Sequence, residues 1–497
     1  AEVYFGKSVE QLEMIEGAFL AGLIRSPSGF DPIRRPERSR ARFRQVVDRL
    51  ADEGIIPAEE ADELAEEYEI PERVRQLESI TTTPTYYTEA LREFLLERSN
   101  ILGDDEQQRA NQLYRGGLRI WTTLDPQAQA FAEEARDTLP DNEQGIDAAI
   151  VSLDARTGAI RAMVGGEGFV PRDNEINMAL VPRQTGSSIK FFILAAALQA
   201  GAQRNDTIDG RVPCTLPNPG DPDNPFTIRQ AVSGTVDPLE AITWRSLNCS
   251  FARLSQIVGL NRVVDTTYRM ARSPYLYQGQ PEEDRVPIQP YASYATGANE
   301  MSPLDMASGA QSLANRGVHH EPYYVDRVER ADGEVLYTHE SLGTRVLDEG
   351  VADTTTDVLT GVLRSGVGTG RRALQDFPFP AAGKTGTQVD NTNSWFVGYT
   401  TDLVTAVWVG DPDGYTPMTS ANVPEFGADG VAEVQGGTYP ARLWRAMMEP
   451  YTFVNPSSEF APPPELTRPA VRLYLPGQEC LFVPAAPPPP TDVPVDG

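Results

Sequence analysis

The sequence predicts a mixed α+β protein whose main part packs helices on an antiparallel sheet, preceded by an all-helical segment. Residues 1–75 carry apolar side chains at helical spacing. From about residue 146, short apolar runs bounded by turn residues alternate with longer apolar runs of helical length. Strands and helices arranged in this way are typical of the α+β class. The length of 497 residues also predicts two or three domains.

The first predicted segment, residues 1–75, contains three helices. Ser8 and Gln11 form a capping-box pattern at the start of a helix that Pro27 ends. Pro57 is placed as the first residue of a third, acidic helix. The apolar stripe of the first helix is Leu12, Ile15, Phe19 and Leu23, and that of the second is Phe43, Val46, Val47 and Leu50.

Residues 76–145 are predicted to connect the helical segment to the main domain and to have some structure of their own. Leu118–Thr123 is the expected strand, and a helix is expected after Pro126.

The main predicted domain spans residues 146–450, and residues 451–497 form a Pro-rich tail that we expect to be flexible. The expected elements are a hairpin of 149–153 and 160–164, a helix starting near Ser187, a loop over 213–226, a helix over 236–258, and strands at 395–399 and 403–409. Together with the segment around Lys384, the last two strands suggest three neighbouring antiparallel strands.

Composition excludes several classes of function. A net charge of −28 and a pI near 4.5 argue against nucleic-acid binding and against a polybasic membrane patch. No apolar run is long enough to span a membrane, and no signal peptide opens the chain, so we expect a fragment that lacks its natural N-terminus. His319 and His320 lack metal-ligand spacing, and neither a metal nor a cofactor is predicted. Cys214 and Cys249 either pair or remain isolated thiols.

Lysine is rare in this chain, and two of its three lysines occur in short patterns that carry chemistry. Lys190 stands in Ser187-Ser-Ile-Lys190, and Lys384 stands in Gly383-Lys-Thr-Gly-Thr387. Arginine keeps its proton in proteins, whereas a desolvated lysine amine can lose it. The spacing of Ser187 and Lys190 puts an amine one helical turn from a hydroxyl. The apolar run after Lys190 predicts a buried helix, and hence a desolvated amine that can act as a base.

Two further patterns, Ser246-Leu-Asn248 and the segment around Lys384, are informative only in combination with the Ser187–Lys190 pattern. Ser246-Leu-Asn248 is a common helix-cap or turn pattern and carries almost no weight alone. The segment around Lys384 could end a phosphate-binding loop, but Pro378 occupies the position that needs the first glycine. The other interpretation is a strand that presents a cation and two hydroxyls to a carboxylate. The ordered set S-x-x-K, S-x-N, K-T-G is far more specific than any member.

This set resembles the signature of serine acyl-transferases that bind penicillin, and the chain as a whole resembles a class A penicillin-binding protein. The resemblance covers about residues 1–450. It includes the segments Arg183–Ser187, Gly297–Gly317, Trp395–Tyr399 and Ala406–Gly410. Residues 1–75 resemble the C-terminal part of the family's lysozyme-like glycosyltransferase domain. Thr185 and Phe191 depart from the prolines usual in the family, which are packing changes near the nucleophile.

The resemblance implies a serine β-lactamase/transpeptidase-like fold and a role for each matching residue. By this resemblance Ser187 is the nucleophile, Lys190 is the base and Ser246 relays a proton. Asn248 holds the substrate backbone, and the strand that binds the carboxylate contains Lys384, Thr385, Gly386 and Thr387. The backbone N–H groups of Ser187 and Thr387 form the oxyanion hole.

The implied function is a peptidoglycan D,D-transpeptidase that cross-links stem peptides ending in D-Ala-D-Ala and is blocked by β-lactams. Its expected partners are peptidoglycan stem peptides, lipid-linked precursors and the cell-wall machinery, at the extracytoplasmic face of a bacterial membrane. The glutamates of the glycosyltransferase are expected upstream of this chain, as is any membrane contact. The alternatives are a DD-carboxypeptidase or β-lactamase, although no Glu-x-x-x-Asn element lies between S-x-N and K-T-G, and a non-catalytic β-lactam sensor.

Overall fold

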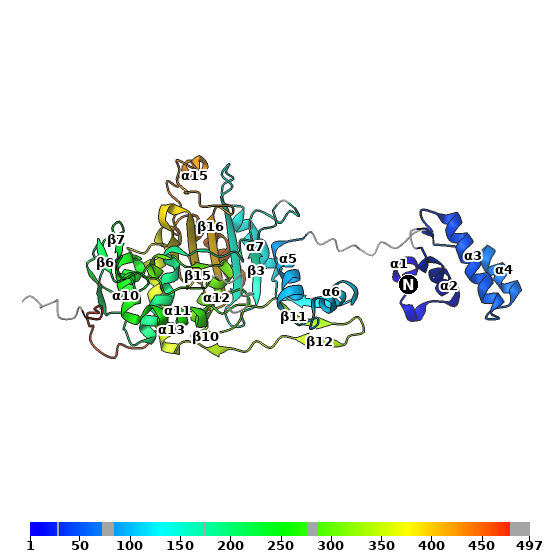
Figure 1. Cartoon of the computed structure of the whole chain (residues 1–497), viewed down its shortest axis with the longest axis horizontal. Helices are drawn as coiled ribbons and strands as arrows, with labels where there is room; N and C mark the ends of the chain where they lie inside the picture. The colour runs from blue at the N-terminus through cyan, green and yellow to red at the C-terminus, as the bar shows by residue number, and fades with distance from the viewer. Residues whose placement is uncertain (27–28, 72–83, 173, 277–286, 478–497) are drawn as a thin grey trace, which may run out of the picture. The chain divides into compact units, whose positions relative to one another are not determined.

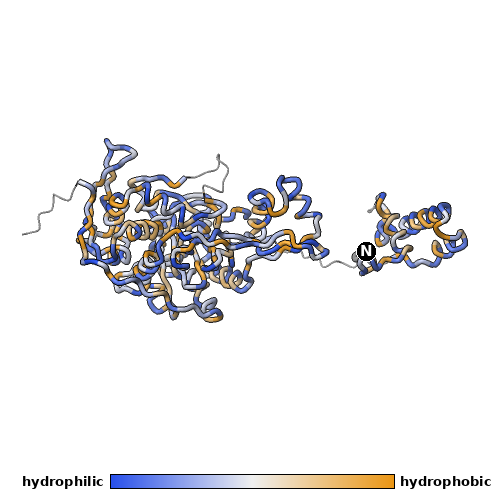
Figure 2. The backbone as a smooth tube through the Cα atoms, turned by 90° about the horizontal axis from the view of Figure 1, so that it is seen from below, coloured by the Kyte–Doolittle hydropathy of each residue, from blue (hydrophilic) through white to orange (hydrophobic). Residues whose placement is uncertain are grey.

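The protein divides into two compact units, residues 1–83 and 84–497 (Figure 1). The structure, a computed structural model, describes residues 1–26, 29–71, 84–172, 174–276 and 287–477. Within these residues, no helix has the length and apolar character needed to cross a membrane. Figure 2 shows apolar and polar residues interspersed along both units, as expected for elements with one buried and one exposed face.

The N-terminal unit is all-helical, as predicted. Its helices are α1 (Glu2–Phe5), a 3-10 turn (Val9–Gln11), α2 (Met14–Ile24), α3 (Pro36–Asp52) and α4 (Ala58–Glu67). Phe19, Phe43 and Val47 are fully buried where α2 and α3 pack together. The Ser8 capping box caps only the 3-10 turn, because Leu12 is extended and separates that turn from α2. Pro57 is the N-cap of α4, so that helix begins at Ala58, one residue later than expected.

The centre of the second unit is a five-stranded antiparallel sheet in the order β14-β15-β16-β2-β3. Its strands are β2 (Asp147–Asp154), β3 (Ile160–Val164), β14 (Ala382–Thr387), β15 (Asn393–Tyr399) and β16 (Leu403–Gly410). The predicted hairpin and the three predicted neighbouring strands are confirmed. Every residue of β15 and β16 is buried, so both faces of the sheet are covered.

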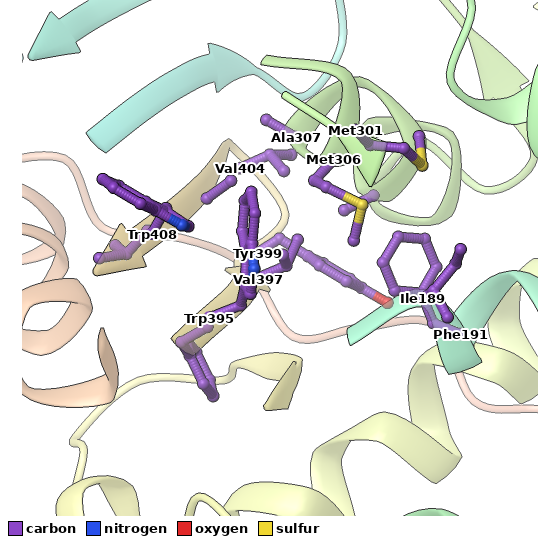
Figure 3. Packing of buried hydrophobic residues seen from close by; sticks show 14 of the residues in the cluster. Ile189, Phe191, Met301, Met306, Ala307, Trp395, Val397, Tyr399, Val404 and Trp408 are labelled. Carbon is purple, nitrogen blue, oxygen red and sulfur yellow. The ribbon is translucent and has the colours of Figure 1, made fainter. Parts of the chain in front are cut away.

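Helices cover the two faces of this sheet in separate layers. On one face, α12 (Pro303–Ala314) packs on β2, β15 and β16. On the other, α7 (Pro126–Arg136) and α16 (Tyr439–Val454) pack side by side. Alternation along β16 separates the layers, because Thr405 contacts the sulfur of Met448 in α16 while Val404 points the opposite way. Figure 3 shows Val404 close to Ala307 and Met306 of α12.

Helix α8 (Lys190–Gln199) is packed among other helices. All residues from Lys190 to Leu198 are buried, in agreement with the predicted buried helix. Its neighbours are α10 (Asn248–Val258), α11 (Leu260–Met270) and α13 (Glu349–Arg364). The apolar sequence of α8 therefore serves a position with no solvent-facing side.

Smaller elements surround this core. The helices are α5 (Tyr86–Glu93), a π-helical turn (Phe94–Arg98), α6 (Glu106–Arg115), α9 (Leu239–Trp244), α14 (Arg371–Leu374) and α15 (Pro424–Ala428). A three-stranded sheet joins β1 (Arg119–Thr122), β11 (Val325–Glu329) and β12 (Val335–Thr338). The two-stranded sheets pair β4 (Arg183–Gln184) with β9 (Glu300–Met301), β5 (Thr207–Asp209) with β8 (Val236–Pro238), β6 (Cys214–Leu216) with β7 (Phe226–Ile228), and β10 (Val318–His319) with β13 (Thr344–Arg345).

Three parts of the second unit differ from the prediction. The expected loop over 213–226 contains β6 and the first residue of β7, which pair with each other. The expected helix over 236–258 is strand β8 followed by two helices, α9 and α10, separated by residues 245–247. The first part of the expected tail packs against the domain, since Asp206 accepts hydrogen bonds from the side chain of Arg468 and the backbone of Val471, and Leu475 is buried. Residues 478–497 lie outside the described residues.

Candidate active site

The predicted nucleophile and base lie at the junction of a 3-10 turn and helix α8. Ser187 is in the 3-10 turn Gly186–Ile189, and Lys190 is the first residue of α8. Side chains three residues apart eclipse one another in 3-10 geometry, so the two side chains line up. The Lys190 Nζ lies 2.8 Å from the Ser187 Oγ. The structure therefore brings this pair within direct hydrogen-bonding distance.

Lys190 is completely buried and surrounded by oxygen atoms. Besides the Ser187 hydroxyl, its Nζ lies 2.8 Å from the Ser246 carbonyl, 3.3 Å from the Ser246 Oγ and 2.6 Å from the Asn248 Oδ1. The Phe251 ring lies beneath the amine, 5.5 Å from Nζ. Burial, together with the positive charge of Lys384, lowers the pKa of Lys190 well below its ordinary value. The site thus favours a neutral amine at this position.

Ser246 and Asn248 reach the site because the chain breaks between α9 and α10. Ser246 has a φ of 56°, in the left-handed region that residues other than glycine seldom adopt. This conformation ends α9 and allows Asn248 to begin α10. The Ser246 Oγ lies between the two lysines, 2.8 Å from the Lys384 Nζ and 3.3 Å from the Lys190 Nζ.

Lys384 lies in the middle of β14 and is also fully buried. Its Nζ donates to the Ser246 Oγ and, at 2.9 Å, to the carbonyl of Thr385. Burial lowers the pKa of Lys384 to about 7. A second buried amine, whose pKa is near neutral, therefore lies beside the Ser246 hydroxyl.

Close backbone approach joins β14 to the turn that carries the nucleophile. Gly186 has a φ of +53°, and a Cβ there would lie 2.6 Å from the carbonyl group of Thr387. A Cβ on Gly386 would lie 2.6 Å from the carbonyl oxygen of Thr185. Only glycine permits such contacts at both positions. They bring the backbones of Ser187 and Thr387 to the same small space, where both predicted oxyanion donors are required.

Sequence reasoning did not identify several groups that contact the motif residues. The Thr369 Oγ1 lies 2.6 Å from the Thr385 Oγ1, the Gly436 N–H donates to the Thr387 Oγ1 at 3.1 Å, and Phe251 lies under Lys190. Phe251 follows the S-x-N pattern by three residues, so its place on the same helix could have indicated it. No local pattern marks Thr369 or Gly436.

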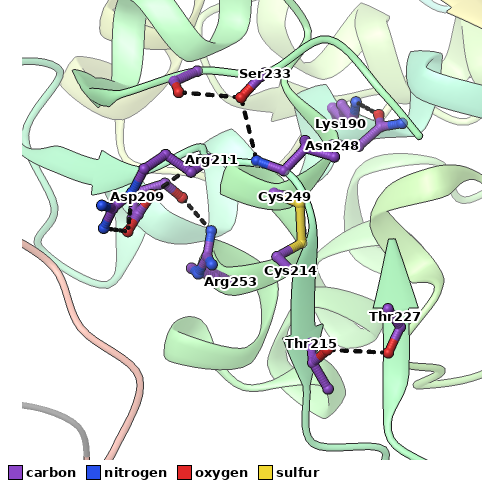
Figure 4. The surroundings of a disulfide bond; sticks show 12 residues. Lys190, Asp209, Arg211, Cys214, Thr215, Thr227, Ser233, Asn248, Cys249 and Arg253 are labelled. Atoms are coloured by element: carbon purple, nitrogen blue, oxygen red, sulfur yellow. Dashed lines mark hydrogen bonds and ion pairs between the residues drawn. A yellow bond between two sulfur atoms is a disulfide. The ribbon is translucent and has the colours of Figure 1, made fainter. Parts of the chain in front are cut away.

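A disulfide joins Cys214 of β6 to Cys249 of α10, which settles the pairing that the sequence left open (Figure 4). Cys249 directly follows Asn248, so the bond anchors the start of α10 beside the predicted site (Figure 4). No group of histidine, cysteine and acidic side chains among the described residues could hold a metal ion. His319 instead contacts Ser312 and the Arg272 carbonyl.

The sheet flanked by helices and the serine–lysine pair define a transpeptidase domain of the penicillin-binding class. Residues 148–423 match the penicillin binding protein transpeptidase domain family, and residues 1–51 match the transglycosylase family. The chain belongs to the class A penicillin-binding proteins. The predicted fold class, with its helical glycosyltransferase remnant, is confirmed.

Curated relatives and solved structures agree with this assignment. The chain is 32% identical to penicillin-binding protein 1A of Mycolicibacterium smegmatis over 100% of its own length and 60% of that relative. It is 32% identical to penicillin-binding protein 1A of Mycobacterium tuberculosis over 90% of its length and 53% of that relative. The chain thus spans little more than half of either relative.

Two solved structures of the Mycobacterium tuberculosis penicillin-binding protein PonA1 are similar to this fold. One has a TM-score of 0.64 and 27% identity, covering 78% of this chain and 98% of that chain. The other, in complex with penicillin V, has a TM-score of 0.63 and 29% identity, covering 76% and 96% of the two chains.

Proposed function

We propose that this chain cross-links peptidoglycan as a D,D-transpeptidase, through an acyl-enzyme on Ser187, and that β-lactams block it by forming a stable ester there. The observation that carries the proposal is the buried Lys190 amine, 2.8 Å from the Ser187 Oγ, in surroundings that lower its pKa. A serine hydroxyl becomes an effective nucleophile when a neutral base takes its proton. The penicillin V complex of PonA1 supports the β-lactam part of the proposal.

The acceptors around Lys190 support its role as base. A neutral amine has two N–H bonds and one lone pair. The Ser246 carbonyl and the Asn248 Oδ1 can only accept, and they lie at 2.8 and 2.6 Å. These two oxygens accept hydrogen bonds from the two N–H groups of the neutral amine, so its lone pair remains available for the hydroxyl proton of Ser187. This arrangement orients the base toward the nucleophile before substrate arrives.

Acylation then proceeds in two bond changes. The Ser187 Oγ forms a bond to the penultimate D-Ala carbonyl carbon while its proton moves to Lys190, and the backbone N–H groups of Ser187 and Thr387 stabilise the oxyanion. When the peptide C–N bond breaks, the Ser246 hydroxyl gives its proton to the leaving D-Ala amine. Lys190, 3.3 Å from that hydroxyl, restores the proton. An amine from a neighbouring stem peptide reverses these steps and forms the cross-link.

The remaining motif residues bind the substrate. Lys384, Thr385 and Thr387 receive the terminal carboxylate on β14, with Gly386 allowing close approach, and the amide N–H₂ of Asn248 holds the substrate backbone. A carboxylate beside Lys384 raises the pKa of that amine, and the resulting charge lowers the pKa of Lys190 further. Substrate binding thereby favours the neutral base.

The setting of the reaction follows from the class. We place the domain at the extracytoplasmic face of the bacterial membrane, acting with the cell-wall machinery on stem peptides and lipid-linked precursors. The parent protein joins a peptidoglycan glycosyltransferase to this domain, since residues 1–51 match the transglycosylase family. No activity of its own is proposed for that remnant.

Labelling with fluorescent penicillin tests the proposal. The native chain should retain the label after denaturation, and Ser187→Ala should not. Ser188→Ala is a matched control, because Ser188 is buried and its hydroxyl donates to the Thr185 carbonyl instead of facing Lys190. Absence of label on the native chain would reject the proposal. Rapid loss of label with turnover of penicillin would favour a β-lactamase. Release of D-Ala without formation of cross-links would favour a DD-carboxypeptidase. Stable label with no release of D-Ala would favour a β-lactam sensor.

A further inference from the structure

The turn between α13 and α14 presents one hydroxyl to the K-T-G strand. Thr369 lies in this turn, and its Oγ1 is 2.6 Å from the Thr385 Oγ1. The Thr369 N–H donates to the carbonyl of Trp244, at the end of α9, at 3.1 Å. Gly437 packs against the Thr369 carbonyl so closely that a Cβ there would lie 2.2 Å away. Thr369 is therefore fixed between the segment leading to Ser246 and the strand carrying Lys384.

We propose that Thr369 is a positioning residue that orients the Thr385 hydroxyl for binding the carboxylate of the substrate. This inference rests on the proposed function, because it assigns a role at the same site. A threonine hydroxyl has one proton to donate. When Thr369 donates its proton to Thr385, the Thr385 proton is directed to an incoming carboxylate. The opposite orientation would present oxygen lone pairs to that negative charge.

The geometry allows this role to be separated from simple packing. Thr369→Val keeps the branched side chain and the backbone N–H that binds Trp244, and removes only the hydroxyl. Thr369→Ser keeps the hydroxyl and removes a methyl group. If Thr369 matters only for its shape, the valine variant should behave like the native chain. If its hydroxyl orients Thr385, the serine variant should behave like the native chain and the valine variant should not.

The experiment is penicillin acylation followed at several drug concentrations, which separates the dissociation constant of the pre-acylation complex from the limiting acylation rate. For Thr369→Val we expect the dissociation constant to rise about fivefold, the effect of losing one hydrogen bond, with the limiting rate within twofold of native. Thr369→Ser should restore native binding. Thr360→Val is the matched control, since the Thr360 hydroxyl only donates to the Asp357 carbonyl within α13.

A double-mutant cycle tests the route through Thr385. In a Thr385→Val background, Thr369→Val should cause no further loss, because the hydroxyl it orients is gone. Thr369→Ala removes the same hydroxyl and replaces Thr369→Val in this cycle if the valine variant folds poorly.

Additive losses in the cycle, failure of serine to restore binding, or a loss confined to the limiting rate would each overturn the inference. A native chain that penicillin does not acylate would instead reject the proposed function, so the two failures are distinguishable.

Discussion

Replacing Lys190 by arginine tests the proposed base directly. Arginine carries a permanent positive charge and cannot give up its proton, whereas the site favours the neutral form of the native amine. The amine that it replaces is fully buried and lies 2.8 Å from the Ser187 Oγ, so the variant removes the proton acceptor and keeps a long basic side chain. A positioned general base contributes about 10² to 10⁴ in rate. We expect acylation by penicillin to fall by that factor, or about 3 to 5 kcal/mol in activation free energy.

The assay is the second-order rate of labelling by fluorescent penicillin. Lys384→Arg is the matched control, because it makes the same replacement at the other buried lysine. There a charge beside a carboxylate is needed, so we expect about tenfold loss at most, the worth of a hydrogen bond to a charged group that is only partly replaced.

Lys190→Met separates chemistry from packing, since methionine is flexible and neutral and also lacks a base. Both Lys190 variants should be slow while their thermal unfolding stays cooperative. Labelling of Lys190→Arg within threefold of native would refute the assignment of Lys190 as base.

Further predictions concern charge and stability. The second-order acylation rate should decline above pH about 7 as free Lys384 loses its proton, and Lys384→Arg should remove that decline; a decline that persists in the variant would assign it to another group. Asn248→Asp should place a carboxylate against Lys190, keep the amine protonated and nearly abolish labelling at pH 7, with partial recovery at higher pH; an unchanged rate would contradict the acceptor arrangement. Burial lowers the pKa of His319 to about 4, whereas the unfolded chain binds that proton near 6.5. Stability is therefore lost as pH falls from about 6.5 to 4, by up to about 3 kcal/mol in denaturant unfolding, and His319→Gln should flatten this dependence. Reducing the Cys214–Cys249 bond, which closes a loop of 35 residues, should lower stability by about 4 kcal/mol and raise the thiol count by two; an unchanged unfolding midpoint after reduction would contradict this.

Much of the fold was predictable because its signals are local. The hairpin of β2 and β3 and the strands β15 and β16 are short apolar runs bounded by turns, and each appears where expected. The three motifs could also be recognised in the sequence, because the chemistry of each needs two or three residues close together in the chain. The two glycines at the site, Gly186 and Gly386, belong to those same motifs.

The elements that the sequence did not reveal depend on contacts between distant segments. Strands β6 and β7 are each three residues long, and the disulfide links β6 to α10. The Pro-rich composition of this segment correctly suggested turns but did not reveal that the two strands pair. Thr369 reaches Thr385 only because α13 packs on β14. A contact between two hydroxyl groups on distant segments leaves no periodic pattern and no compositional bias in the sequence, so only the three-dimensional structure reveals it.

The break at Ser246 shows why the expected continuous helix over 236–258 was wrong at the candidate site. Helical propensity would continue α9 into α10, whereas a left-handed residue costs about 1 to 2 kcal/mol. The conformation aims the Ser246 carbonyl at Lys190 and the Ser246 hydroxyl at Lys384. A regular helix would keep that carbonyl for its own ladder and leave two buried amines without these acceptors, which costs about 1 to 3 kcal/mol for each unsatisfied group. The local strain is therefore offset by the hydrogen bonds to the lysines, so Lys190, Lys384 and the strained turn at Ser246 stabilise one another.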